Sequence, residues 1–148
     1  MLKTTGAFMM CLLLMSCSGT KLSGPGVKDG QLAPCPGSPN CVSTRAQDEK
    51  HRMDPIRYTG TKEQAHLRLV KVLASMPRTK IVTDRGDYVH VVFTSRLFRF
   101  RDDVEFVLHD AEKLIHFRSA SRLGYSDLGV NRKRMEEIGK RFAGAMLP

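Results

Sequence analysis

Several features that mark particular classes of protein are missing from this chain. It has 148 residues, no tryptophan and only 7% aromatic residues. The length allows one modest domain and excludes a large multidomain enzyme. Hydrophobic residues are not scarce, at 41% beside 26% charged residues, which is typical of a globular chain and not of a disordered one. Acidic residues are in deficit, with 15 Asp and Glu against 24 Lys and Arg, and the net charge of +9 suggests an anionic partner.

The N-terminus is predicted to be a signal peptide. The apolar run Ala7–Met15 follows Lys3 and is too short to span a bilayer. It ends in Leu14-Met15-Ser16-Cys17, which resembles the lipobox of bacterial lipoproteins. The resemblance implies a signal peptide over residues 1–16 and acyl chains, palmitate among them, on Cys17 that anchor the protein in the cell envelope, facing the periplasm. Ser18 replaces the aspartate that retains such proteins in the inner membrane, so the outer membrane is favoured; a plain secretory signal with an incidental cysteine is the alternative.

Two cysteines are left for the exported part of the chain. Cys11 leaves with the signal peptide and Cys17 is lipidated, so Cys35 and Cys41 remain. Two thiols six residues apart in a loop rich in Pro and Gly, in an oxidising compartment, indicate a disulfide. Redox chemistry, a metal site or free thiols are the alternatives, although zinc would need two further ligands.

The exported chain divides into a tether and one domain. Residues 17–33, with the lipidated cysteine, several glycines and few apolar side chains, are predicted to be a flexible tether. Residues 34–148 are predicted to form a single globular domain, which begins with a Pro-rich loop carrying the two cysteines and continues as loop over residues 45–57. The chain has no internal repeat.

Apolar periodicity predicts an α+β domain. A capping box at Thr61–Gln64 opens an amphipathic helix that ends at Pro77, and a second helix with Asn131 as its N-cap closes the chain, its apolar face including Met135, Ile138, Phe142 and Met146. Between the helices, strands are predicted over residues 80–83, 88–94, 104–109 and 114–120, while 96–101 is either extended or a linker. The order α-β-β-β-β-α indicates an antiparallel sheet of about four strands with two helices packed on one face.

The last hairpin also permits a prediction of register. Its paired positions sum to 223, so that Phe106 faces Phe117 on the core face and Glu105 faces Arg118 on the other face. We expect the second pair to be a solvated ion pair contributing about 0.2 to 1 kcal/mol.

Three motifs resemble a known bacterial family. They occupy residues 32–43, around the two cysteines, residues 100–106, with sequence Phe-Arg-Asp-Asp-Val-Glu-Phe, and residues 118–134, from Arg118 to Arg134. All three are similar to the family catalogued as domain of unknown function 1499 (DUF1499), and the similarity extends over about residues 32–142. The resemblance implies an envelope or membrane-associated protein. It implies no agreed activity, and therefore no catalytic residues.

The third motif is rich in arginine and hydrogen-bond donors, which suggests a site for an anionic group at the start of the last helix. The candidate anion-binding residues are Arg118, Ser121, Arg122, Asn131, Arg132 and Arg134. The alternative is a structural ion-pair network in which nearby acids neutralise these arginines. The acids of that network are Asp102, Asp103, Glu105 and Asp127.

Two hypotheses of function follow. The leading one is a non-catalytic, membrane-anchored envelope lipoprotein that binds an anionic envelope ligand or a protein partner through residues 118–134. The other is a small enzyme acting on an anionic envelope substrate, with Asp102, Asp103 or Glu105 as acid or base. No cofactor is expected, no nucleic-acid partner is expected for an exported protein, and no metal is expected because His109 and His116 alone do not make a metal site.

Overall fold

A computed structural model describes residues 24–145 of the protein. The predicted signal peptide, the lipidated Cys17 and Met146 lie outside these residues. The strands are β1 (Val27–Lys28), β2 (Gln31–Leu32), β3 (Cys41–Ser43), β4 (Ile56–Arg57), β5 (Thr79–Asp84), β6 (Tyr88–Thr94), β7 (Arg101–His109) and β8 (Leu114–Ser121), and the helices are α1 (Lys62–Ser75) and α2 (Val130–Gly144). Among the described residues, no helix has both the length and the apolar character needed to cross a membrane.

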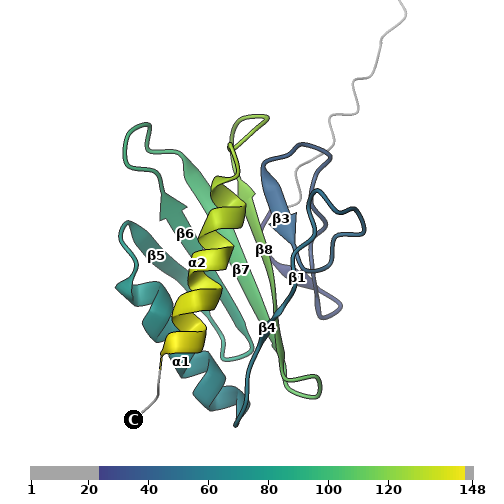
Figure 1. Ribbon diagram of the computed structural model, residues 1–148, viewed down its shortest axis with the longest axis vertical. Helices are drawn as coiled ribbons and strands as arrows, with labels where there is room; N and C mark the ends of the chain where they lie inside the picture. Colours follow the sequence, from purple (N-terminus) through teal and green to yellow (C-terminus); the bar gives the residue numbers. More distant parts are fainter. Residues whose placement is uncertain (1–23, 146–148) are drawn as a thin grey trace, which may run out of the picture.

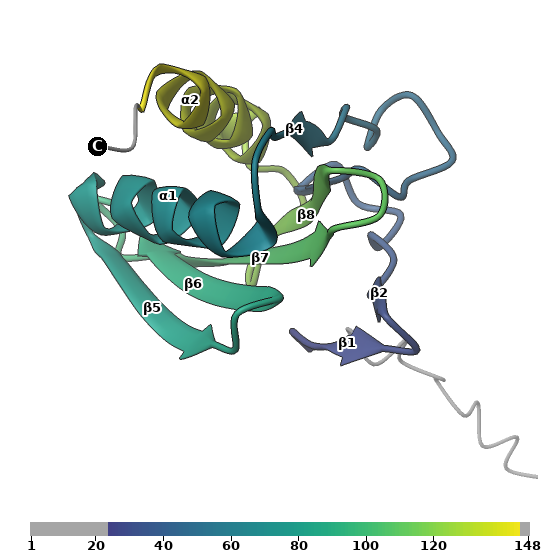
Figure 2. The same cartoon turned by 90° about the horizontal axis from the view of Figure 1, so that it is seen from below.

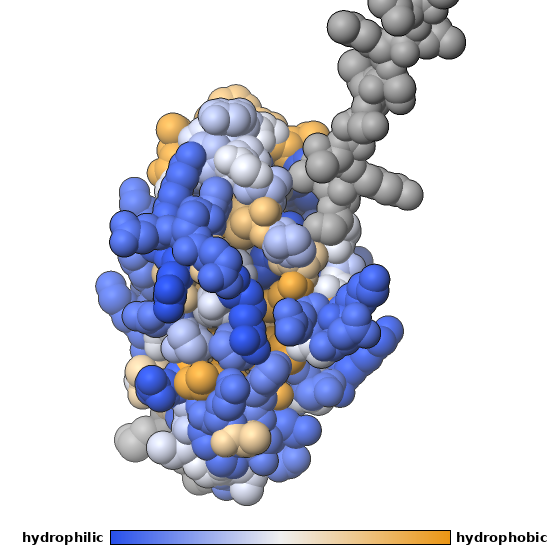
Figure 3. Space-filling model, turned by 90° about the vertical axis from the view of Figure 1, so that its right-hand side faces the viewer, coloured by the Kyte–Doolittle hydropathy of each residue, from blue (hydrophilic) through white to orange (hydrophobic). Residues whose placement is uncertain are grey.

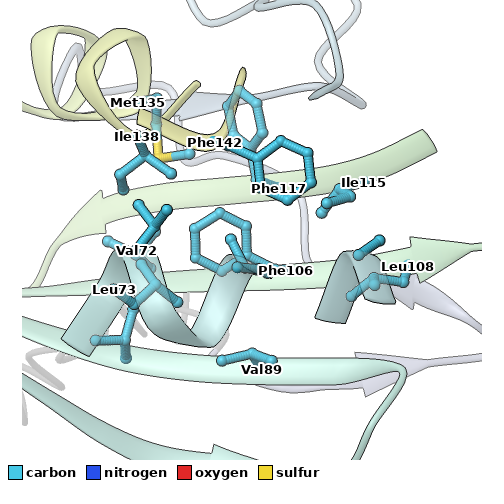
Figure 4. Close-up of a cluster of buried hydrophobic side chains, with 14 of the residues drawn as sticks. Val72, Leu73, Val89, Phe106, Leu108, Ile115, Phe117, Met135, Ile138 and Phe142 are labelled. Atoms are coloured by element: carbon cyan, nitrogen blue, oxygen red, sulfur yellow. The ribbon is translucent and has the colours of Figure 1, made fainter. Parts of the chain in front are cut away.

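The α+β prediction is confirmed. The two helices lie side by side on one face of an antiparallel sheet (Figures 1 and 2). Helix α1 starts as predicted, because the Thr61 hydroxyl accepts from the Gln64 amide while the Gln64 side chain accepts from the Thr61 amide. Between the helices and the sheet lies the hydrophobic core (Figure 4). Its fully buried side chains include Leu69, Leu73, Val89, Phe106, Ile115, Phe117, Met135, Ile138 and Phe142.

The sheet is wider than the four predicted strands. Its order is β3-β8-β7-β6-β5, and β4 also pairs with β8, which makes six strands. Strands β3 and β4 come from segments predicted as loop. They have three and two residues, too few for an alternating pattern to show in the sequence. Their pairing with the edge of β8 is a tertiary contact, and the predicted Cys35–Cys41 disulfide is present, with Cys41 as the first residue of β3.

The predicted register of the β7–β8 hairpin is confirmed, with Phe106 opposite Phe117 and Glu105 opposite Arg118. The prediction of a solvated Glu105–Arg118 pair is wrong, because the two side chains are only 0% and 5% exposed. A short hairpin of β1 and β2 lies next to this face of the sheet (Figure 2), and the amide of Gly26 donates to Glu105 Oε1.

That hairpin also alters the predicted tether. Residues 27–32, expected to be part of a flexible leash, form a paired hairpin, and the Leu32 side chain is buried. The tether prediction therefore does not hold for this part of residues 17–33. Residues 17–23 lie outside the described part of the chain.

Candidate functional site

Three arginines and three carboxylates form ion pairs along β7 and β8, two of the pairs on the face of the sheet away from the helices and one on the face towards α2. The ion pairs are Glu105 with Arg118, Asp103 with Arg122, and Asp102 with Arg134. The sheet explains why they lie close together, because Asp102, Asp103 and Glu105 are on β7 and face Ser121, Ala120 and Arg118 of β8. We call these six residues the arginine–carboxylate network.

Glu105 is the most deeply buried acid of the network. Its carboxylate accepts from Arg118 Nη1 at 3.3 Å, from the Tyr88 hydroxyl at 2.9 Å and from the Gly26 amide at 2.6 Å. Burial, followed by the charge of Glu105 and the hydrogen bond to it, raises the pKa of Tyr88 well above its ordinary value. Tyr88 is thus a hydrogen-bond donor to a fixed carboxylate and not a base at neutral pH.

Two side chains, those of Arg122 and His90, contact the Asp103 carboxylate. Arg122 binds it through two hydrogen bonds of 2.8 Å each, and His90 Nε2 lies 2.7 Å from Asp103 Oδ1. Burial of the carboxyl opposes its ionisation, but the hydrogen bonds from His90 and Arg122 outweigh burial, and the pKa of Asp103 lies well below its ordinary value. The same contact raises the pKa of Arg122. Both side chains therefore stay charged at neutral pH.

Asp102 and Arg134 connect the sheet to α2. Arg134 donates to Asp102 Oδ2 and to Asn131 Oδ1, and its guanidinium carbon lies 4.8 Å from the centre of the Phe93 ring. Both charged side chains are about nine-tenths buried. This guanidinium is surrounded by partners inside the protein.

Asn131 is the centre of a second set of hydrogen bonds. Its amide nitrogen lies within hydrogen-bond distance of the Asn40 carbonyl at 3.1 Å and of the Ser121 hydroxyl at 3.0 Å, and its amide oxygen accepts from Ser119. The prediction that Asn131 caps α2 is wrong, since Gly129, at φ 78°, is the N-cap and Asn131 is buried inside the first turn. Asp127 supplies the capping oxygen instead, accepting from the Asn131 amide at 2.8 Å.

Arg132 points away from the network. Its guanidinium donates to the carbonyl oxygens of Lys50 and Arg52, at 2.9 and 3.2 Å, which ties α2 to the loop before β4. It also lines a groove between α2 and residues 49–57, which has a volume of about 720 Å³. Thus Arg118, Arg122 and Arg134 contact carboxylates, Arg132 contacts backbone carbonyls, and Ser121 and Asn131 contact each other.

These contacts limit the chemistry that the network can perform. An acid–base catalyst needs a carboxyl group able to exchange a proton with a substrate. Asp102, Asp103 and Glu105 are each engaged by an arginine. The concavity that adjoins Asp103, lined also by Arg118, Ser121 and Arg122, has a volume of only about 250 Å³. Each of the three acids considered for catalysis is therefore paired with an arginine.

Comparison with known proteins identifies the family of this chain. A family model described as protein of unknown function (DUF1499) matches residues 31–142. The chain belongs to the DUF1499 family. No curated protein and no solved structure gives a significant match. The family description supplies no activity for this DUF1499 chain.

One surface was missed by the sequence-based reasoning. The loop after β6, residues 95–100, and the loop after β8, residues 122–129, lie at the same end of the molecule (Figure 1), where the Arg122 amide donates to the Arg101 carbonyl. We call residues 95–101 and 122–130, which comprise these loops and the first residue of the element after each, the loop end. Its apolar side chains are 47 to 87% exposed. They are Leu97, Phe98, Phe100, Leu123, Tyr125, Leu128 and Val130. The alternation Arg-Leu-Phe-Arg-Phe-Arg over residues 96–101 was the available signal.

Replacing Asp103 by Asn should reduce the stability of this DUF1499 chain in a pH-dependent manner. Because the folded state lowers the pKa of Asp103, its stabilisation is complete above the ordinary carboxyl pKa of about 4 and is lost as the pH falls below that value. We expect Asp103→Asn to lower the free energy of unfolding by about 1–2 kcal/mol at pH 7, a value reduced by the partial exposure of Arg122. The difference from the parent protein should shrink as the pH falls.

Urea unfolding at several pH values measures this difference. Glu137→Gln is the matched control, because Glu137 pairs with Arg141 on the exposed surface of α2. A difference between Asp103→Asn and the parent that stays constant from pH 7 to acid pH would contradict the assignment.

Proposed function

We propose that this protein is a non-catalytic envelope domain, anchored through lipidated Cys17, that binds an anionic membrane surface with its loop end. The observation that carries the proposal is the combination of exposed apolar side chains and arginines on two adjacent loops. An anionic membrane surface belongs to the class of anionic ligands that the net charge of the chain suggests. The binding surface, however, lies mainly outside the buried arginines of residues 118–134, and includes Arg122 at its border.

Charge supports an anionic surface as the ligand. Arg96, Arg99 and Arg101 are exposed on the loop end, and no carboxylate among residues 24–145 lies within salt-bridge distance of them. Each Arg near an anionic bilayer adds about 1 kcal/mol of attraction. The arrangement differs from the arginine–carboxylate network, in which each guanidinium is neutralised.

Apolar exposure supports a bilayer in particular. Leu97 and Phe98 are 79% and 70% exposed, and Phe98 and Phe100 stack with ring centres 5.6 Å apart. The loop that carries them is closed by hydrogen bonds between Ser95 and Phe100, so the side chains are presented by an ordered backbone. Figure 3 shows hydrophobic surface at this upper end of the molecule. Apolar side chains beside cationic ones are the composition of a protein surface that enters the lipid headgroup region.

The position of Gly24, close to Cys17 along the chain, also supports the proposal. Gly24 lines the same small concavity as Ser121 and Arg122, next to the loop end. It is seven positions after Cys17, a length of chain that spans at most about 25 Å. An acyl anchor on Cys17 would therefore hold the loop end within reach of the bilayer.

Tryptophan fluorescence tests the proposal directly, because the chain has no tryptophan of its own. The variant Phe98→Trp is prepared in the full chain with Cys17→Ser, so that acylation does not contribute, and is mixed with phosphatidylglycerol vesicles. We expect a blue-shifted emission that is quenched by brominated lipid, and weaker binding to vesicles of phosphatidylcholine alone. Leu67→Trp is the matched control, because Leu67 is 61% exposed on α1, away from the loop end (Figure 1).

A second variant tests the contribution of the apolar side chains. Replacing both Leu97 and Phe98 by Ser should weaken binding, measured by cosedimentation with the vesicles, by tenfold or more, since a fully buried Leu or Phe contributes roughly 1.5–3 kcal/mol. In the Phe98→Trp variant, tryptophan emission that stays unshifted and unquenched on anionic vesicles would overturn the membrane proposal and favour a protein partner. Equal binding to anionic and neutral vesicles would overturn the role of the arginines.

A further inference from the structure

The turn between β7 and β8 brings two histidines and a glutamate together, at the end of the sheet opposite the loop end (Figure 1). His109 is the last residue of β7, His116 lies in β8, and Glu112 lies in the turn between them. His109 pairs with Leu114 and Val107 pairs with His116, so the two histidines are diagonal neighbours on one face of the hairpin. Their rings are 5.0 Å apart between centres.

We propose that His109, Glu112 and His116 bind a divalent transition-metal ion of the zinc class, with the remaining coordination positions open to water or to an external ligand. Two imidazoles and one carboxylate form a ligand set that suits zinc and related ions, whereas calcium and magnesium prefer oxygen ligands alone. The sequence showed two histidines and no third ligand. The turn supplies the third by folding Glu112 back over the strands.

The distances between the candidate ligand atoms fit one small ion. In tetrahedral zinc sites, bonds of about 2.0–2.1 Å place two ligand atoms about 3.3 Å apart. His116 Nε2 lies 3.4 Å from Glu112 Oε2, and His109 Nδ1 lies 3.9 Å from the same oxygen. All three ligand atoms lie within 4.8 Å of one another. Small rotations of the His109 and Glu112 side chains, which are 30% and 54% exposed, would bring the longer separations towards the ideal value.

The contact on the other side of the His116 ring suits a metal ligand. Thr44 Oγ1 lies 3.0 Å from His116 Nδ1, and the same hydroxyl oxygen accepts from the Phe117 amide. A metal at Nε2 requires the proton on Nδ1, and Thr44 is placed to accept the hydrogen bond from it. Such a partner on the second nitrogen fixes the tautomer and the orientation of a metal-binding histidine. With its side chain only 8% exposed, His116 is also held by its surroundings.

Burial decreases from one ligand to the next across the site. The side chains of His116, His109 and Glu112 are 8, 30 and 54% exposed. The ion would therefore be bound on one side by a fixed imidazole and would face solvent on the other side. Three protein ligands with an open position distinguish such a site from a closed, four-ligand structural zinc site.

Zinc titration of the full chain, without a histidine tag, tests the proposal. Isothermal titration calorimetry with zinc chloride should show one equivalent bound, and cobalt chloride should give the visible absorption of a low-coordinate ion. Glu112→Ala and His109→Ala should each weaken zinc binding by at least tenfold. Thr44→Val should weaken it by about tenfold, the lower end of the effect of removing a hydrogen-bond partner of a ligand. Cys11 and Cys17 are present in every variant, so they do not contribute to the differences.

A matched control and a second readout make the test independent of folding. His66→Gln removes a histidine that also contacts a carboxylate, Asp84 Oδ1 at 2.6 Å, but on a different surface, and it should leave zinc binding unchanged. In the unsubstituted chain, zinc should shift the nitrogen resonances of His109 Nδ1 and His116 Nε2 in the NMR spectrum. An isotherm that Glu112→Ala leaves unchanged, or zinc that shifts neither imidazole, would overturn the site.

Discussion

Glu105→Ala is expected to lower the free energy of unfolding by about 3–5 kcal/mol, the range for breaking a buried ion pair by removing one partner. The Glu105 side chain is 0% exposed and that of Arg118 is 5% exposed. Truncation would leave the guanidinium buried without its carboxylate, and would also leave the Tyr88 hydroxyl and the Gly26 amide without their acceptor. Arg118 Nε already has no hydrogen-bond partner within the described residues, so little remains to compensate the charge.

Urea unfolding of three variants separates the lost ion pair from lost packing. Glu105→Met combined with Arg118→Met removes both charges while keeping side-chain volume, and should recover much of the stability lost in Glu105→Ala. Glu137→Ala removes the exposed partner of Arg141 and should change stability by less than about 0.5 kcal/mol. A loss below about 1 kcal/mol for Glu105→Ala would mean that water reaches the Arg118 guanidinium.

Asn131→Ala is expected to lower the free energy of unfolding by about 2–4 kcal/mol, because several buried polar groups lose their partner at once. The side chain is 0% exposed and joins four parts of the chain. It contacts the Asn40 carbonyl before β3, the Ser119 and Ser121 hydroxyls of β8, the Asp127 carboxylate and Arg134 of α2. The variant should also expose the loop of residues 122–129 to faster cleavage by proteases, since Asn131 holds both ends of it.

A conservative variant and a surface variant complete the second test. Asn131→Asp retains the shape but replaces the donor by a charge next to Asp127, so it should be destabilised at pH 7 and recover as the carboxyl groups are protonated. Ser126→Ala removes an exposed hydroxyl that accepts from the Leu128 amide in the same loop, and should have an effect below about 0.5 kcal/mol. Equal stability of Asn131→Ala and the parent would contradict the central position of this side chain.

The two predictions assign a structural role to most of residues 118–134. The arginine–carboxylate network and Asn131 join β7, β8, α2 and the segment before β3. They therefore hold the loop end in place, with the charges of Arg118 and Arg134 paired inside the protein. Under the proposed function, binding depends on Arg96, Arg99 and Arg101 and the apolar side chains beside them. Stability depends on Arg118 and Arg134.

Much of the fold was predictable from local patterns. The capping box at Thr61 defines the start of α1, because both of its hydrogen bonds join residues three positions apart. The register of β7 and β8 was predictable because side chains along a strand alternate between the two faces of the sheet. A shift by one residue would have turned Phe106 and Phe117 out of the core. The disulfide was equally predictable, because Cys35 and Cys41 are only six positions apart in a Pro-rich segment and therefore stay close together.

The sequence predicted which residues form the candidate site, but not which of them are buried. The sequence placed acids of β7 near the basic third motif, yet Glu105 and Arg118 were expected to be solvated. Their burial depends on residues 24–32, which carry few apolar side chains and give no periodic signal. The N-cap was misassigned to Asn131 because Asn is a good capping residue, while here Gly129 adopts the left-handed conformation and Asp127 supplies the oxygen.

By itself, the sequence determined the features that depend on neighbours along the chain: the α+β class, the helix start, the hairpin register, the disulfide and membership of the DUF1499 family. Only the tertiary structure decided which charges are neutralised, which apolar side chains stay exposed, and that Glu112 joins His109 and His116. The physical reason is that burial and ion pairing are set by what covers a residue. The Gly26 amide that contacts Glu105, for example, lies 79 positions away along the chain.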